Sequence, residues 1–153
     1  MRPTIDYRKA NPEALAAMRG LEEYVRRCAL EEPLLELVRT RASQINGCAY
    51  CIDMHTKDAR AAGETEQRLY LLSAWREAPF YSDRERVALA WAEAVTQISS
   101  RDVSDELYAQ ARKHFDEKAL ADLTLAIIAI NGWNRFNIAF RTTVKDYVSP
   151  HSR

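Results

Sequence analysis

The sequence predicts an all-α protein, built as a single helical domain of six to seven helices. Three observations support this prediction. Glycine and proline are scarce, with 4 Gly and 5 Pro among 153 residues, so few positions interrupt a helix. Apolar residues recur mostly at intervals of three and four, which is the period of one helix face. The chain shows no low-complexity tract, internal repeat or linker that would divide it, so we expect one domain over residues 1–153.

The expected elements follow one another with short turns. The first ten residues are expected to be irregular. Asn11 and Pro12 then supply an N-cap and a first-turn proline for a helix that runs towards Leu30. A second helix opens at Pro33 and reaches about Asn46. The later helices are expected over 48–62 and 65–78, after the caps Ser82 and Ser104, and from Asp116 to about Thr142.

The bulk composition argues against several classes of protein. Lys and Arg number 22, as do Asp and Glu, so the formal net charge is zero and no basic excess is available for nucleic acid. A hydrophobic content of 47% disfavours intrinsic disorder. The N-terminus has no apolar segment typical of a signal peptide, and the longest apolar run, 125–130, is too short to cross a bilayer. We therefore expect a cytoplasmic protein with no nucleic-acid and no membrane partner.

The strongest functional signal is the segment GCAYCIDMH at residues 47–55. Cys48 and Cys51 lie three apart and His55 follows four later, so on a helix all three share one face. Gly47 breaks the preceding helix, which places both cysteines at a helix N-terminus, where unpaired N–H groups favour a thiolate. Two cysteines at this spacing can also form a disulfide. In a cytosolic chain such a pair indicates redox chemistry or metal binding.

The redox interpretation assigns each side chain a step. Cys51 loses its proton to His55, attacks a peroxide O–O bond and becomes a sulfenic acid. Cys48, nearer the helix tip and expected to be the more exposed thiol, condenses with it to a disulfide. An external dithiol then reduces that disulfide by exchange. A carboxylate that orients His55 would complete the proton relay.

Two other interpretations of the cysteine pair remain open. Zinc could bind Cys48, Cys51 and His55, but a structural site needs a fourth ligand, which His114 or His151 would have to supply from afar. The pair could also be wholly structural. The third cysteine, Cys28, is expected to be a small buried hydrophobe without chemistry.

Three further regions carry polar groups whose function the sequence does not decide. Glu36 lies next to the apolar stripe of its helix, so it faces either a partly buried site or solvent. The segment 131–135 interrupts the long last helix with polar and aromatic groups, as expected of a site wall, an interface or an exposed patch. His151 is expected in a loose tail.

Taken together, Glu36, Cys48, Cys51 and His55 have the form E-x11-C-x2-C-x3-H. This pattern resembles the signature of the alkylhydroperoxidase-D-like branch of the carboxymuconolactone decarboxylase superfamily. The resemblance extends over about residues 12–145, with weaker similarity at 82–86 and 133–135. It implies an all-helical fold, a homo-oligomer (trimer or hexamer) and a disulfide-cycling peroxidase with neither cofactor nor metal. It also implies a hydroperoxide substrate and a dithiol reductant, such as a lipoyl group or a redox protein.

The resemblance also implies roles for the four residues. Cys48 is the outer thiol that donates a proton and meets the reductant, Cys51 carries the sulfenic acid, and His55 and Glu36 relay protons. One position departs from the pattern, because the best-known peroxidase of the family has a histidine just before the second cysteine, where this chain has Tyr50. The alternatives are a disulfide reductase without strong peroxidase activity, a carboxymuconolactone decarboxylase-like enzyme, and a zinc-binding helical module. The decarboxylase reading is weaker because decarboxylase members lack the cysteine pair.

Overall fold

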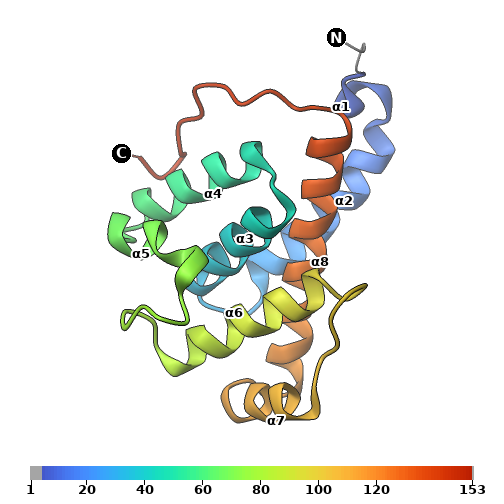
Figure 1. Cartoon of the computed structure of the whole chain (residues 1–153). Coiled ribbons are helices and arrows are strands. Elements are labelled where there is room, and N and C mark those ends of the chain that lie inside the picture. The colour runs from blue at the N-terminus through green and yellow to red at the C-terminus, as the bar shows by residue number, and fades with distance from the viewer. Residues whose placement is uncertain (1–4, 153) are drawn as a thin grey trace.

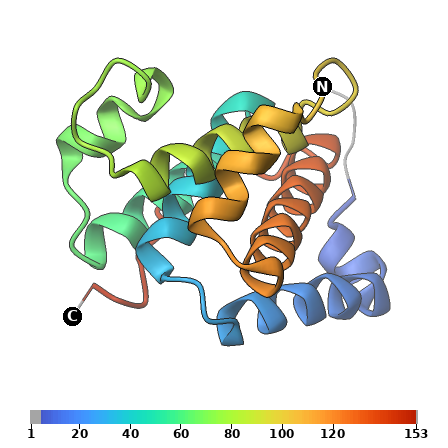
Figure 2. The same cartoon turned by 90° about the horizontal axis from the view of Figure 1, so that it is seen from below.

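Two helices, α3 (Glu32–Asn46) and α8 (Glu117–Ala139), organise the fold, which is described here by a computed structural model of residues 5–152. Figure 1 shows α3 at the centre, packed against α4 (Ala49–Ala61), α6 (Asp83–Thr96) and α8. From below, α2 (Pro12–Arg27) lies against α8, and α7 (Asp105–His114) lies against α6 (Figure 2). No strand occurs among the described residues, so the all-α prediction is confirmed.

Most helices begin where the sequence predicts, because a side chain satisfies the free N–H groups of the first turn. Asn11 accepts a hydrogen bond from the Ala14 backbone and Pro12 opens α2. Ser82 and Glu85 form a reciprocal capping box at the start of α6. Ser104 and Asp116 cap α7 and α8 in the same way.

The structure corrects the prediction at the N-terminus. A short helix, α1 (Tyr7–Ala10), occupies part of the region expected to be irregular, and Asp6 caps it by accepting from the Arg8 backbone. The buried Tyr7 ring packs on Phe136 and Phe140 of the last helix, with centroid distances of 4.8 and 5.6 Å. Such a short helix depends on long-range contacts that no local periodicity reports.

The helix expected over 65–78 is shorter than predicted. It divides into α5 (Glu66–Tyr70) and a 3₁₀ turn, η1 (Leu72–Ala74). Leu69, Leu72 and Trp75 lie three residues apart and are all buried in one cluster, a spacing that suits a turn of three residues better than an α-helix. With α1 added, residues 5–152 hold eight α-helices instead of six to seven. The last of them ends at Ala139, earlier than the predicted Thr142, and Arg141 follows with a positive φ of 51°.

The main hydrophobic core joins α2, α3, α6, α7 and α8. Its fully buried members include Leu35, Val38, Phe115 and Ile127. Cys28 is half-buried and packs against the edge of this core, which agrees with an apolar role. A separate small cluster surrounds the cysteine pair, formed by Ala42, Cys48, Cys51 and Ile130.

The chain after α8 packs across the surface instead of hanging free, contrary to the loose tail expected there. Figure 1 shows residues 140–152 running from the end of α8 over α4. The hydroxyl of Tyr147 donates to Oδ1 of Asp58 on α4 at 2.9 Å, and Ser149 is buried. This tail therefore covers the helix that begins at the cysteine pair.

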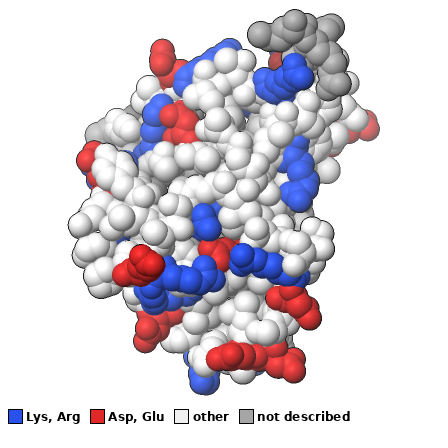
Figure 3. Space-filling model, in the orientation of Figure 1, with Lys and Arg blue, Asp and Glu red and all other residues white. Residues whose placement is uncertain are grey.

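The surface and the helix lengths bear on two expectations about partners. On the face seen in Figure 3, basic and acidic side chains are interspersed, as expected for a chain of zero formal charge. Among residues 5–152, every helix is too short or too polar to cross a membrane.

Candidate active site

The cysteine pair lies at a tight turn between α3 and α4. Gly47 adopts a left-handed conformation, with φ of 70°, and its N–H bonds back to the carbonyl of Gln44 at 3.2 Å. The N–H of Cys48 bonds to the carbonyl of Ser43 at 3.0 Å. Cys48 is then the N-cap of α4, so Cys51 lies in the first turn and His55 one turn later. This short connection lays α4 against α3.

Both thiols are buried, which corrects one prediction. Cys48 is 2% exposed and Cys51 0% exposed, so Cys48 is not the open outer thiol expected from its place at the helix tip. The turn at Gly47 folds Cys48 inward against Ala42 and Ile130. Cys51, in contrast, lines a cavity of about 570 Å³.

The cavity lies between α1, α2, α3, α4, α8 and the tail. Three apolar side chains, Leu15, Met54 and Trp133, contribute to its wall. Trp133 comes from the polar and aromatic segment 131–135, which therefore serves as a site wall; its indole N–H donates to Oε2 of Glu22 at 3.2 Å. His151 in the tail lines the same cavity, whereas His114 ends α7 outside it.

Two of the predicted relay groups meet directly inside this cavity. Nδ1 of His55 lies 2.9 Å from Oε2 of Glu36, and both side chains are buried. Nε2 of His55 has no hydrogen-bond partner among the described residues, so it is the ring nitrogen left for a thiol or a substrate. Burial acts to raise the pKa of Glu36, but the hydrogen bond from His55 and the charges of His55 and Arg39 outweigh burial and hold that pKa below its ordinary value.

Sequence reasoning missed Arg39, which contacts the carboxylate of Glu36. Its guanidinium contacts three carboxylates at once, those of Glu36 (2.8 Å), Glu32 (2.8 Å) and Glu22 (3.0 Å), although Arg39 is only 4% exposed. Nothing in the local pattern of α3 indicates such a buried cation. Arg39 fixes one oxygen of Glu36, which leaves the other oxygen to orient His55.

The two thiols differ strongly in acidity. The hydrogen bond from the Cys51 thiol, helped by the Cys51 backbone N–H, the Asn134 amide and the charge of His55, outweighs burial and lowers the pKa of Cys48 to about 6. The same contact with Cys48, together with burial, raises the pKa of Cys51 well above its ordinary value. These contacts favour the thiolate at Cys48 over the thiolate at Cys51.

Another group that sequence reasoning missed contacts the Cys51 sulfur. Asn137 of α8 donates its amide N–H to Sγ of Cys51 at 3.4 Å, and Tyr7 of α1 donates its hydroxyl to Oδ1 of Asn137 at 3.3 Å. These contacts span 86 and 130 residues of chain, so no spacing rule could find them. The only available signal was a polar residue on the buried face of a core helix.

Potential metal ligands also gather in the cavity. Within residues 5–152, one group brings three such atoms within 4.8 Å of one another, from Glu36, His55 and Asp58. Neither cysteine belongs to this group, so the described residues do not bring together the zinc ligand set considered above. The Arg39 guanidinium beside Glu36 would also repel a cation there.

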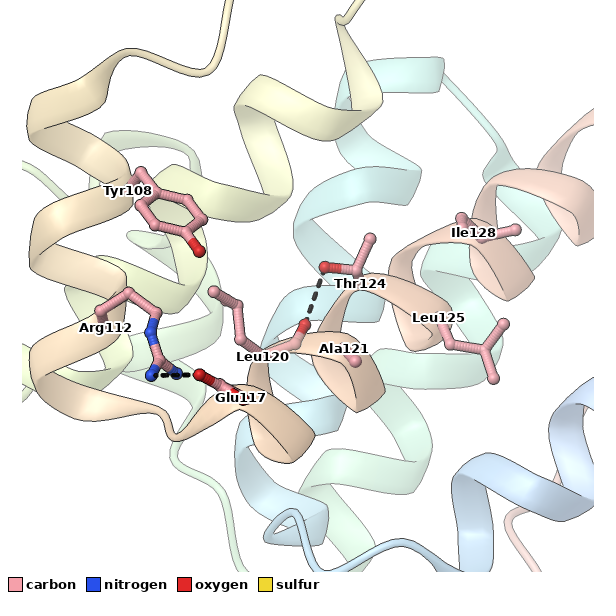
Figure 4. A pocket seen from close by; sticks show the side chains of 8 residues that line it. All are labelled: Tyr108, Arg112, Glu117, Leu120, Ala121, Thr124, Leu125 and Ile128. Atoms are coloured by element: carbon pink, nitrogen blue, oxygen red, sulfur yellow. Dashed lines mark hydrogen bonds and ion pairs between the residues drawn. The ribbon is translucent and has the colours of Figure 1, made fainter.

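A second hollow, of about 410 Å³, lies between α7 and α8 (Figure 4). The Arg112–Glu117 ion pair, at 3.5 Å, bounds it on one side, and Leu125 and Ile128 extend its apolar wall. Its polar lining comes from Tyr108, Arg112, Glu117 and Thr124, and no cysteine or histidine lines it. The cavity at Cys51, in contrast, contains both a thiol and an imidazole.

Comparison with known proteins identifies relatives of this chain. The chain is 48% identical to the uncharacterized protein YdfG of Bacillus subtilis (strain 168), over 91% of this chain and 95% of that protein. It is 42% identical, with a TM-score of 0.91, to a protein of unknown function from Agrobacterium tumefaciens proposed to be the antioxidant defence protein AhpD; the match covers 95% of this chain and all of that one. An uncharacterized peroxidase-related protein from Silicibacter sp. TM1040 shares the fold, with a TM-score of 0.79 and 24% identity over 94% of this chain and 76% of that one.

The carboxymuconolactone decarboxylase family model matches residues 12–94, a span that contains Glu36, both cysteines of the pair and His55. The match covers more than half of the chain. Together with the YdfG and Agrobacterium relatives, it shows that the chain belongs to the carboxymuconolactone decarboxylase family, in its alkylhydroperoxidase-D-like branch.

Proposed function

We propose that the protein is a thiol-dependent peroxidase, which reduces hydroperoxides at Cys51 and is recycled through a Cys48–Cys51 disulfide. One observation carries this proposal: of the two buried thiols, Cys51 lines a cavity that also holds the hydrogen-bonded His55 and Glu36. A nucleophile, a proton-transferring base and the carboxylate that orients it are the groups such a reaction needs. The proposed AhpD role of the Agrobacterium relative agrees with an antioxidant function.

The first step forms the sulfenic acid. Cys48 carries the thiolate and takes the proton of the Cys51 thiol across their hydrogen bond, which leaves the charge on Cys51. The Cys51 thiolate attacks the terminal oxygen of the hydroperoxide, the O–O bond breaks, and the terminal oxygen stays on sulfur with its proton as a sulfenic acid. His55 holds the proton that Cys48 released when its thiolate formed; the departing alkoxide takes this proton and leaves as the alcohol.

The second step closes the disulfide. Neutral His55 removes the proton now on Cys48, and the new thiolate attacks the Cys51 sulfur. The S–O bond breaks, and the hydroxide takes the proton from His55 and leaves as water. Glu36, held by Arg39, keeps the imidazole oriented and balances its charge in both steps.

An external dithiol returns the site to its starting state by thiol–disulfide exchange. We propose a lipoyl group or a small redox protein for this role. Both cysteines are buried, so the reductant must reach them through the cavity beside Cys51. We also propose a homo-oligomer, trimer or hexamer, as the family resemblance implies; light scattering at micromolar concentration measures this.

The test of the proposed function is a thiol count before and after one equivalent of hydroperoxide, followed by turnover with dihydrolipoamide. We expect the loss of two thiols per chain, their recovery on reduction, and multiple turnovers. The rate of peroxide consumption should rise with pH through about 6, because the Cys48 thiolate that starts the cycle forms as the pH passes its pKa. A chain that keeps all its thiols under excess peroxide is not a peroxidase of this kind.

Substitution of His55 by Gln tests the relay. Gln can still hydrogen-bond to Glu36 but cannot hold or pass a proton, so we expect peroxide turnover to fall by about 10²-fold. Glu36→Gln should also lower peroxide turnover, but less strongly, because Glu36 orients His55 and is not the group that passes the proton to the substrate. His114→Gln, at the end of α7 outside the cavity, is the matched control and should leave turnover unchanged. Equal rates of peroxide turnover for His55→Gln and His114→Gln would show that His55 has no part in the mechanism.

A further inference from the structure

We propose that Asn137 is a catalytic residue that draws negative charge onto Cys51, and that Tyr7 positions it. The inference rests on the proposed function, because it concerns the sulfur assigned to peroxide attack. Both side chains are buried and come from opposite ends of the chain. Neither residue belongs to the E-x11-C-x2-C-x3-H pattern.

The geometry at the sulfur carries the first step of the argument. Nδ2 of Asn137 donates to Sγ of Cys51 at 3.4 Å, and both residues are buried, at 5% and 0% exposure. A donor aimed at a sulfur stabilises the thiolate and the sulfenate more than the neutral thiol, and the gain is larger where water is excluded. The amide N–H therefore favours the charged, reacting form of Cys51.

The orientation of the amide is set by Tyr7. An Asn side chain can present either its oxygen or its NH₂ group to a neighbour. The Tyr7 hydroxyl donates to Oδ1 of Asn137 at 3.3 Å, so the amide oxygen is occupied and the NH₂ group is turned to the sulfur. The Tyr7 ring is itself held by Phe136 and Phe140, and the guanidinium of Arg8 lies over it at 5.1 Å.

The Asn137 amide opposes an effect of the cysteine pair on the position of the negative charge. The hydrogen bond between the thiols favours the charge on Cys48, which does not line the cavity, whereas the sulfur proposed to attack the peroxide is Cys51. The amide of Asn137 acts in the opposite direction, because it lowers the pKa of Cys51 against burial and the Cys48 charge. Other charged or titratable side chains line the cavity with Cys51 and come from α1, α2, α3, α4 and the tail: Tyr7, Arg8, Arg19, Glu22, Arg26, Glu32, Glu36, Arg39, Tyr50, His55, Asp58, Tyr147 and His151.

The test isolates Cys51 as the only cysteine, in a Cys28→Ser, Cys48→Ser background, and follows its thiolate by ultraviolet absorbance against pH. Asn137→Ala should raise the pKa of Cys51 and reduce the thiolate fraction at a given pH by about tenfold. Asn137→Asp keeps the shape but places an acceptor at the sulfur, so it should reduce the fraction at least as much. Tyr7→Phe, which frees the amide to turn, should give a smaller change in the same direction.

The matched control is Tyr24→Phe, which also removes a tyrosine hydroxyl that bonds to α8, here to Asp122 at 2.7 Å, at a site that does not line the cavity. It should leave the Cys51 thiolate curve unchanged. Circular dichroism checks whether each variant is folded. If Asn137→Ala does not fold, Tyr7→Phe still tests the inference. A purely structural role for Asn137 predicts a normal curve for folded Asn137→Ala and for Tyr7→Phe, neither of which adds a charge at the sulfur, and that result would overturn the inference.

The same variants, with Cys48 and Cys28 restored, separate this inference from the proposed function. If the unsubstituted chain consumes peroxide and the Asn137 variants form sulfenic acid equally fast, the inference fails and the peroxidase stands. If the variants shift the Cys51 curve but the unsubstituted chain consumes no peroxide, the peroxidase fails and the assignment of Asn137 to the thiolate stands.

Discussion

Substitution of Cys51 by serine is expected to abolish peroxide consumption, whereas Cys48→Ser should permit one attack and then stop. The first result follows because the sulfur on the cavity wall is lost. The second follows because a sulfenic acid forms without a second thiol but cannot close a disulfide. The measurements are peroxide consumed per chain in a single turnover and labelling by a sulfenic-acid probe located by mass spectrometry.

Cys28→Ser is the control for this experiment, since Cys28 lies at the edge of the main core and should leave turnover intact. The reverse assignment has a physical basis, because Cys48 has the lower pKa, about 6. Labelling of Cys48 in the Cys51→Ser variant, with loss of the first attack in Cys48→Ser, would show that acidity and not access decides which sulfur reacts. If neither serine variant changes the rate, the cysteine pair is not the catalytic centre.

Arg39→Met is expected to reduce the free energy of unfolding by about 3–5 kcal/mol, because it leaves the buried carboxylate of Glu36, and the more exposed ones of Glu22 and Glu32, without their shared cation. Arg39 contacts three carboxylates within 3.0 Å, and Met keeps the apolar stem while removing the charge. Arg135→Met is the matched control on an exposed arginine that bonds only within α8 among the described residues, and it should cost well under 1 kcal/mol. Urea unfolding measures both.

The pH dependence of this loss has a definite sign. In the unsubstituted protein the pKa of Glu36 lies below its ordinary value of 4.5, so Glu36 stabilises the fold above that pH and loses this contribution as the pH falls through its folded value. Without Arg39 part of that contribution is missing, so the difference between Arg39→Met and the unsubstituted chain should shrink in acid. A loss that is equal to that of Arg135→Met, or constant with pH, would mean that the three carboxylates do not depend on Arg39.

The sequence predicted the parts of the site that are local. Cys51 and His55 share a helix face because four residues complete about one turn, and Gly47 marks the turn because its backbone is left-handed. Glu36 was ambiguous on helix periodicity alone, since it lies next to the apolar stripe; only the family pattern pointed it towards His55. The structure places the two side chains in contact.

The parts that the sequence could not predict depend on contacts between distant segments. Arg39 looks like any charged residue on a helix until α2 brings Glu22 against it. Tyr7 lies in a helix too short to show a period, and Asn137 meets Cys51 only when α8 packs on α4. The burial of Cys48 was also mispredicted, because a helix tip is usually open, whereas here the preceding turn folds it into the interior.

The tight turn at Gly47 has a consequence for how the protein is made. Chains emerge from the ribosome N-terminus first, and contacts close in sequence form before distant ones. The α3–α4 hairpin, with Glu36, both thiols and His55, is therefore synthesised and able to close while α8 has yet to appear. Until α8 docks, the nascent cysteines lack the cover of Ile130 and Trp133, so an oxidant can reach them without passing through the finished cavity. Translation is thus the interval in which these two sulfurs are most open to premature oxidation.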